Sequence, residues 1–99
     1  MNFLINYNDK IFKLCEQHKV KTLYAFGSVL TEKFNTQSDI DLIVDFQNVP
    51  LEEYADNYYN FKFSLQDTLK RDIDLLEEIA IKNPYFRQVV SNQKQLVYG

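Results

Sequence analysis

Short apolar runs recur along the chain and predict four strands. The runs 22–26 and Ile40–Phe46 are apolar and partly aromatic, which is typical of strands. A third strand is predicted over 71–76, and a short final strand over Gln95–Tyr98. These four segments are the expected members of a single sheet.

Apolar residues at helical spacing predict two amphipathic helices. The first helix, over 3–19, carries its apolar stripe at Ile11, Leu14, Cys15 and His18. The second and longer helix, over 51–70, carries its stripe at Leu51, Tyr54, Ala55, Tyr58, Phe61, Leu65 and Leu69. Tyr58 and Tyr59 cannot be equally buried, because adjacent residues point about 100° apart on a helix. One of the two is expected at an interface.

Two shorter helices are predicted over 29–34 and 83–92, and residues 35–38 are predicted to form a polar turn. The element order is therefore helix, strand, strand, long helix, strand, helix, strand. Strands joined by a long helical crossover favour parallel pairing. We expect an α/β (α+β) fold, in which a small mixed β-sheet is flanked by helices that pack against one face.

The composition is that of one soluble globular domain spanning residues 1–99. The net charge of −3 disfavours DNA or RNA as the main ligand, since nucleic-acid binding usually shows a basic footprint. The apolar runs are too short to span a membrane, and the N-terminus lacks the features of a signal peptide. The single cysteine, Cys15, cannot form an internal disulfide, which fits a cytoplasmic protein.

The candidate chemistry lies in a Gly-Ser pair that is followed, after ten residues, by two aspartates separated by one residue. Gly27 permits a backbone geometry that other residues resist, and Ser28 offers an amide and a hydroxyl to a phosphate oxygen. Asp39 and Asp41 project from the same side of the strand Ile40–Phe46, because side chains two residues apart share a face. Two such carboxylates form the hard-oxygen site that magnesium selects when substrate phosphates also hold it.

Other acidic residues are candidates to join Asp39 and Asp41. The segment Asp72-Ile73-Asp74 offers two candidates on one strand face. Asp45 also alternates onto the face of Asp39 and Asp41, but it lies farther along the strand and is expected to meet solvent or a salt bridge.

The Gly-Ser pair and the two aspartates at this spacing resemble the signature of the minimal nucleotidyltransferases, a small branch of the polymerase-beta superfamily. The resemblance covers nearly the whole chain and implies a polymerase-beta-like fold. It also implies that Gly27 and Ser28 grip the nucleotide's phosphates. The family's third aspartate lies in a V-D-L run, which Ile73-Asp74-Leu75 matches here. The resemblance thus selects Asp74 to join Asp39 and Asp41 in binding Mg²⁺ and in catalysis.

One departure from the family pattern falls directly after the Gly-Ser pair. Many relatives carry Ala-Arg-Gly where this chain has Leu30, Thr31 and Glu32. If that arginine meets the phosphates, its loss weakens nucleotide binding or leaves the role to another cation. Lys33 is the nearest candidate, although a lone lysine on a short helix is usually solvated.

The resemblance implies a Mg²⁺-dependent nucleotidyltransferase that moves AMP from ATP onto a hydroxyl. Larger relatives carry an additional helical domain that builds the acceptor site, and this chain stops at Gly99 without one, so the acceptor is expected on another protein. Stand-alone members are typically antitoxins paired with a HEPN-type ribonuclease toxin, which they neutralise by adenylylating a tyrosine.

Two alternatives remain at the level of the sequence. The protein could be an antitoxin that acts by binding and occlusion, with a weak or vestigial nucleotide site; the missing arginine favours this, and the three retained aspartates oppose it. It could also be the catalytic subunit of a two-protein small-molecule nucleotidyltransferase. Nucleotide binding separates the first alternative from the enzyme, and the identity of the labelled acceptor separates the second.

Overall fold

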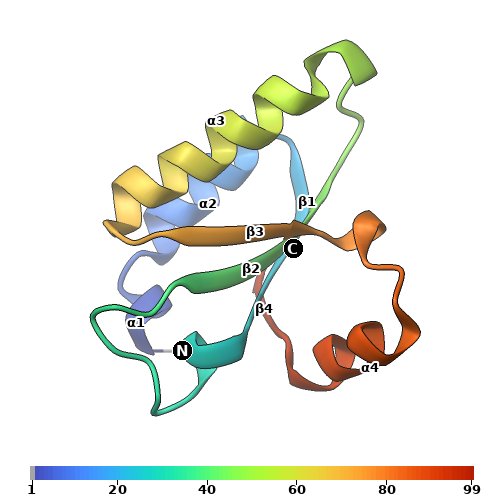
Figure 1. Cartoon of the computed structure of the whole chain (residues 1–99). Coiled ribbons are helices and arrows are strands. Elements are labelled where there is room, and N and C mark those ends of the chain that lie inside the picture. Colours follow the sequence, from blue (N-terminus) through green and yellow to red (C-terminus); the bar gives the residue numbers. More distant parts are fainter. Residues whose placement is uncertain (1) are drawn as a thin grey trace.

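A four-stranded mixed sheet forms the centre of the computed structural model, which describes residues 2–99 (Figure 1). The strands are β1 (Val20–Phe26), β2 (Ile40–Phe46), β3 (Ile73–Glu77) and β4 (Gln95–Tyr98), in the spatial order β3-β2-β1-β4. β1 pairs antiparallel with both β2 and β4, whereas β2 and β3 pair in parallel. The parallel pair is the one joined by the long helix, so the mixed sheet predicted from the crossover is confirmed.

Two helices, α2 (Asn8–Gln17) and α3 (Leu51–Leu69), cover one face of the sheet (Figure 1). Alternate residues of β2 point toward these helices and are fully buried, which follows from the two-residue period of a strand. Helix α3 meets them with residues spaced four apart, which share one helical face. The main core contains, among others, Ile40, Leu42, Val44, Phe61, Leu65 and Leu69.

The opposite face of the sheet carries α4 (Pro84–Gln93), so the prediction that all helices pack against one face is wrong (Figure 1). β4 lies beside β1, at the other edge of the sheet from β3, and the chain crosses this open face between them. A small second core of Ile43, Ile81 and Val90 fills the contact. Pro84 begins the helix, and the Asn83 side chain accepts hydrogen bonds from the amides of Tyr85 and Phe86 at 2.9 and 3.2 Å.

The single N-terminal helix predicted over 3–19 is wrong, because the segment forms two helices, α1 (Asn2–Ile5) and α2. The break lies at Tyr7, whose φ and ψ of −115° and 10° are not helical. Asn6 and Asn8 flank Tyr7, and asparagine favours turns over helix interiors because its side chain competes for backbone hydrogen bonds.

The short helix predicted over 29–34 is also wrong in its bounds. A single 3₁₀ turn, η1 (Gly27–Leu30), begins two residues earlier and ends at Thr31. The amide and hydroxyl of Thr31 both donate to the carbonyl of Ser28, at 2.9 and 3.0 Å. Residues 31–39 then form a loop that leads into β2.

The long helix is confirmed, but its predicted apolar stripe holds only in the second half. Leu51 is 89% exposed and Ala55 is exposed, because the first turns of α3 extend beyond the sheet (Figure 1). Tyr58 is half-buried and its hydroxyl donates to the carbonyl of Leu75, whereas Tyr59 is 52% exposed. Nowhere between residues 2 and 99 is there a helix both long enough and apolar enough to cross a membrane.

Candidate active site

The Gly-Ser turn lies directly against one of the predicted metal ligands. β1 ends at Phe26, and Gly27 then takes a φ of +78°, which favours glycine. A Cβ atom added to Gly27 would lie 2.5 Å from Oδ2 of Asp41, closer than real contacts allow. Glycine is therefore favoured by the turn, and a larger residue here would have to displace the Asp41 carboxylate.

Register places Asp41 and Asp74 side by side. Asp41 pairs with Phe26 on one side and with Asp74 on the other, so the three residues form one row across β1, β2 and β3. The pKa of Asp41 is raised, first by burial, then by the charges of Asp74 and Asp39, and by a hydrogen bond with the Asp74 carboxyl. Register and charge thus both link the two carboxyl groups.

Asp39 completes the group from outside the strand. It is exposed and precedes β2 by one residue, and its charge acts on Asp41. Unlike Asp41 and Asp74, it belongs to the loop 31–39 and is not held in the sheet ladder.

The other two aspartates considered from the sequence lie elsewhere. Asp72 is exposed before β3 begins, and its contact with β2 is through its carbonyl, which accepts from the Ile40 amide at 3.0 Å. Asp45 lies toward the far end of β2, where its charge helps to raise the pKa of Tyr54 on α3. Neither contributes to the raised pKa of Asp41, so the structure brings Asp74, and not Asp72 or Asp45, to the Asp39–Asp41 pair.

The chemistry of this group fits a hard divalent cation. All its donors are carboxylate oxygens, and a cation would relieve the repulsion that raises the pKa of Asp41. Within residues 2–99, however, no three histidine, cysteine, aspartate or glutamate side chains already stand in an arrangement that could hold a metal ion. Asp41 and Asp74 are the pair held in register by the sheet, and Asp39 is the carboxylate whose placement depends on a loop.

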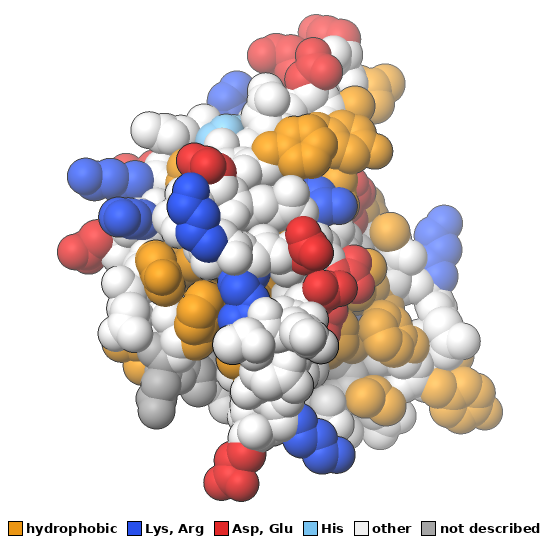
Figure 2. Space-filling model, turned by 60° about the vertical axis from the view of Figure 1, so that its left-hand side comes forward, with side chains coloured by type: hydrophobic (Ala, Val, Ile, Leu, Met, Phe, Trp, Pro, Cys, Tyr) orange, Lys and Arg blue, Asp and Glu red, His pale blue; other side chains and the backbone are white. Residues whose placement is uncertain are grey.

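Acidic side chains gather on the face shown in Figure 2, with hydrophobic side chains beside them. A polar hollow of about 350 Å³ opens at Asp39, between the loop and the end of α3, where Gln66, Lys70 and Arg71 also line it. A second, more apolar hollow of about 440 Å³ lies farther along β3, against Leu76 and Phe86.

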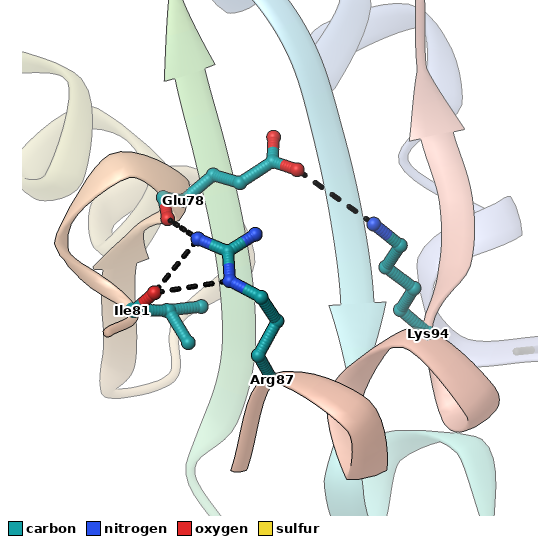
Figure 3. Close-up of polar contacts among 4 residues, drawn as sticks. All are labelled: Glu78, Ile81, Arg87 and Lys94. Carbon is teal, nitrogen blue, oxygen red and sulfur yellow. Dashed lines mark hydrogen bonds and ion pairs between the residues drawn. The ribbon is translucent and has the colours of Figure 1, made fainter. Parts of the chain in front are cut away.

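Arg87 fixes the segment that borders the second hollow (Figure 3). Its guanidinium donates to the carbonyl of Ile81 from Nε and Nη2, at 3.1 and 2.7 Å, and to the carbonyl of Glu78 at 3.2 Å. The Lys94 ammonium lies 3.8 Å from the Glu78 carboxylate and 4.2 Å from the centre of the Tyr24 ring. These contacts hold α4 and the end of β3 together on the face that carries the aspartates.

Sequence reasoning missed Arg71, which it placed at the start of a strand. The strand begins at Ile73, because Lys70 takes a left-handed φ of 55° and ends α3 there. The Arg71 guanidinium instead donates to the carbonyls of Asn35 and Ser38 in the loop before Asp39. These partners lie 36 and 33 positions earlier, so no local pattern could have revealed the contact.

The fold, and the aspartates grouped beside a Gly-Ser turn, are those of a nucleotidyltransferase domain. The chain belongs to the polymerase beta nucleotidyltransferase family, which it matches over residues 9–99. The predicted polymerase-beta-like fold class is therefore confirmed, as is the resemblance to the minimal nucleotidyltransferases.

Relatives of known name come from Methanocaldococcus jannaschii. One is 33% identical over 95 residues, covering 96% of this chain and 90% of its own length. Another is 29% identical over 102 residues, with the same shares of 96% and 90%. Both are named as candidate protein adenylyltransferases.

Solved structures share the fold across almost the whole chain. A candidate minimal nucleotidyltransferase superposes with a TM-score of 0.76 at 24% identity, covering 93% of this chain and 90% of that one. A chain from a structure of a tri-AMPylated HEPN toxin of Shewanella oneidensis with an MNT antitoxin gives a TM-score of 0.64 at 23% identity, covering 96% and 71%. A toxin–antitoxin with AMP-PNP gives 0.69 at 24% identity, covering 93% and 73%.

Proposed function

We propose that this protein transfers AMP from ATP to a hydroxyl group, with Mg²⁺ bound by Asp39, Asp41 and Asp74. The observation that carries the proposal is the row across the sheet in which Asp41 lies between the Gly27 turn and Asp74. Family membership and the names of the relatives support the same reaction.

The metal, when bound, would neutralise phosphate charge and favour in-line displacement. The chain's own residues have separate tasks. Gly27 and Ser28 hold the phosphates where the glycine leaves room, and Asp39 and Asp41 supply the ligands next to them. Asp74 accepts the proton of the acceptor hydroxyl, whose oxygen bonds to the α-phosphorus as pyrophosphate leaves.

The proposed acceptor is a tyrosine of a HEPN-type toxin, which this protein neutralises as its antitoxin. Support comes from the relatives named as protein adenylyltransferases and from the neighbour crystallised with a tri-AMPylated HEPN toxin. We propose a cytoplasmic location, because the proposed reaction consumes ATP and the free thiol of Cys15 suits a reducing compartment.

Occlusion without catalysis is the second candidate, and Thr31 is the observation that favours it. Threonine is uncharged, so this position supplies no cation to a phosphate, and its hydroxyl donates to the Ser28 carbonyl at 3.0 Å. Lys33 is exposed on the same loop. A catalytic subunit that docks on a separate helical protein and labels a small molecule is a third candidate, which the identity of the labelled acceptor would reveal.

Thermal unfolding tests the nucleotide site directly. ATP should raise the Tm with Mg²⁺ present and much less with EDTA, because a ligand that binds only the folded state stabilises it by mass action. The double variant Asp39→Asn with Asp41→Asn should fold and lose the shift. Equal shifts in the wild type and the double variant would rule out this site.

A further inference from the structure

The loop 31–39 carries Asp39 and ends in a turn that closes on itself. The amide of Ser38 donates to the carbonyl of Asn35 at 3.1 Å, and the amide of Asn35 donates to the Ser38 hydroxyl at 3.1 Å. The amide of Gln37 donates to the Asn35 side chain at 2.8 Å. These bonds shape the turn but do not attach it to the rest of the domain.

Arg71 makes that attachment. One guanidinium nitrogen donates to the carbonyls of both Asn35 and Ser38, the two ends of the turn. The guanidinium also lies 4.3 Å from the centre of the Phe34 ring and 5.4 Å from that of Phe3, which pack on each other at 5.3 Å. A planar, always-charged group suits this position, because it can stack on a ring and bind two carbonyls at once.

The contact bears on Asp39 through the backbone. Ser38 directly precedes Asp39, and Ile40 directly follows it, with its amide bonded to the Asp72 carbonyl at 3.0 Å. Hydrogen bonds therefore hold the backbone on both sides of Asp39. The Ile40 amide makes the bond on the strand side, and Arg71 makes the bond on the loop side through the Ser38 carbonyl. The strand ladder fixes Asp41 and Asp74 without help from the loop.

We propose that Arg71 is the positioning residue for Asp39, and that it sets how readily the third carboxylate joins Asp41 and Asp74 at the metal. This inference rests on the proposed Mg²⁺ site. Groups that orient metal ligands typically change metal affinity or activity by about 10–100-fold when removed. Lys70 is the matched control, because it is a cation beside the same hollow whose ion pair is with Asp67 at 3.3 Å and not with the loop.

The experiment compares the wild type with Arg71→Met, Arg71→Lys and Lys70→Met. Hydrogen exchange without ligand measures how well the amides of residues 35–39 are protected. The Mg²⁺ concentration that gives half of the ATP-induced Tm shift measures the apparent Mg²⁺ affinity of the site. Arg71→Met should speed exchange in the loop and raise that Mg²⁺ concentration at least tenfold, while excess Mg²⁺ restores the full shift. Arg71→Lys should fall between, and Lys70→Met should match the wild type.

Three results would overturn the inference. Unchanged exchange at 35–39 in Arg71→Met would show that the loop does not depend on the guanidinium. If Arg71→Met exchanges faster but needs a Mg²⁺ concentration within about twofold of that of the wild type, Arg71 stabilises the loop without affecting metal binding. An equal effect of Lys70→Met would assign the change to general charge. If Arg71→Met does not fold, Arg71→Lys and Phe34→Leu give the same comparison. If the wild type itself shows no Mg²⁺-dependent Tm shift, the proposed function is refuted instead.

Discussion

At the scale of single residues, Asp41 lies at the centre of the candidate site. The Gly27 turn approaches it from the β1 side, Asp74 faces it across the parallel pair, and the charge of Asp39 acts on it from the loop. The charges of Asp74 and Asp39 disfavour an ionised Asp41 in the free protein, and both become useful once a cation is bound. Such a site is costly for folding and suited to binding.

The pKa of Asp41 lies above its ordinary value of 3.8 in the folded protein, which fixes the sign of a pH effect. The folded state holds the proton more tightly than the unfolded state, so this contribution is fully present below about pH 3.8 and is lost as pH rises through the raised pKa. In metal-free buffer at pH 7, Asp41→Asn should therefore raise the Tm. The gain should shrink as pH falls toward 4.

Thermal scans from about pH 4 to 7.5, with EDTA throughout, measure this effect. Asp72→Asn is the matched control, since Asp72 is exposed on the adjacent strand entry and makes no contribution to the pKa of Asp41. A lower Tm for Asp41→Asn at neutral pH would contradict the account of Asp41.

The choice of Asp74 over Asp72 is tested by separating binding from transfer. Asp74→Asn should keep most of the ATP-dependent Tm shift but lose AMP transfer by about 10²–10⁴-fold, the usual worth of general-base assistance. Asp72→Asn should transfer label from α-labelled ATP at close to the wild-type rate. The reverse pattern would assign the base to Asp72.

At the scale of elements, β2 and α3 could be predicted because each is decided by its own sequence. β2 is an apolar run of strand length, and α3 has a 19-residue helical pattern preceded by Pro50. The break at Tyr7 was missed because the surrounding apolar spacing continues through it. The face chosen by α4 depends on strand order, which no local pattern encodes.

The residues of the candidate site also fall into those that the local sequence predicts and one that it does not. Gly27, Asp39 and Asp41 could be predicted from a spacing motif, and the resemblance to the family's V-D-L run selected Asp74 over Asp72. Arg71 could not, since its partners are distant in sequence and its own neighbours predicted a strand. The sequence therefore predicts the residues of the candidate site itself, whereas only the three-dimensional structure shows that Arg71 contacts the loop 31–39.

Helix α4 depends on its first turn, since only Val90 along its length is buried. Asn83→Ala removes the side-chain acceptor for the Tyr85 and Phe86 amides, and should cost about 1 kcal/mol, or roughly 4–8 °C in Tm for a domain of this size. Circular dichroism during heating measures it. Asn92→Ala, at an exposed position near the end of the same helix, should change the Tm little. Equal losses of Tm in both variants would show that the Asn83 cap does not stabilise the helix.

At the scale of the whole molecule, two groups stand out among the exposed apolar side chains of residues 3–99. Leu51, Tyr59 and Phe63 project from α3, with the Tyr59 and Phe63 rings stacked at 6.0 Å. On the face that carries the site, the exposed group consists of Ile79, Tyr85, Phe86 and Val89. Phe86 in the second group contacts Phe26, which pairs with Asp41 in the sheet, so this apolar surface lies next to the strand row of the site.

Intact mass of a co-expressed HEPN-type protein, the proposed partner, tests the central claim most directly. After incubation with Mg²⁺ and ATP, the wild-type protein should add one or more AMP groups to the partner, and peptide mapping should place them on a tyrosine. Asp41→Asn should form the complex and add none, because the ligand between the Gly27 turn and Asp74 is gone. A toxin fully neutralised by Asp41→Asn with no adduct would instead establish occlusion and contradict the enzymatic account.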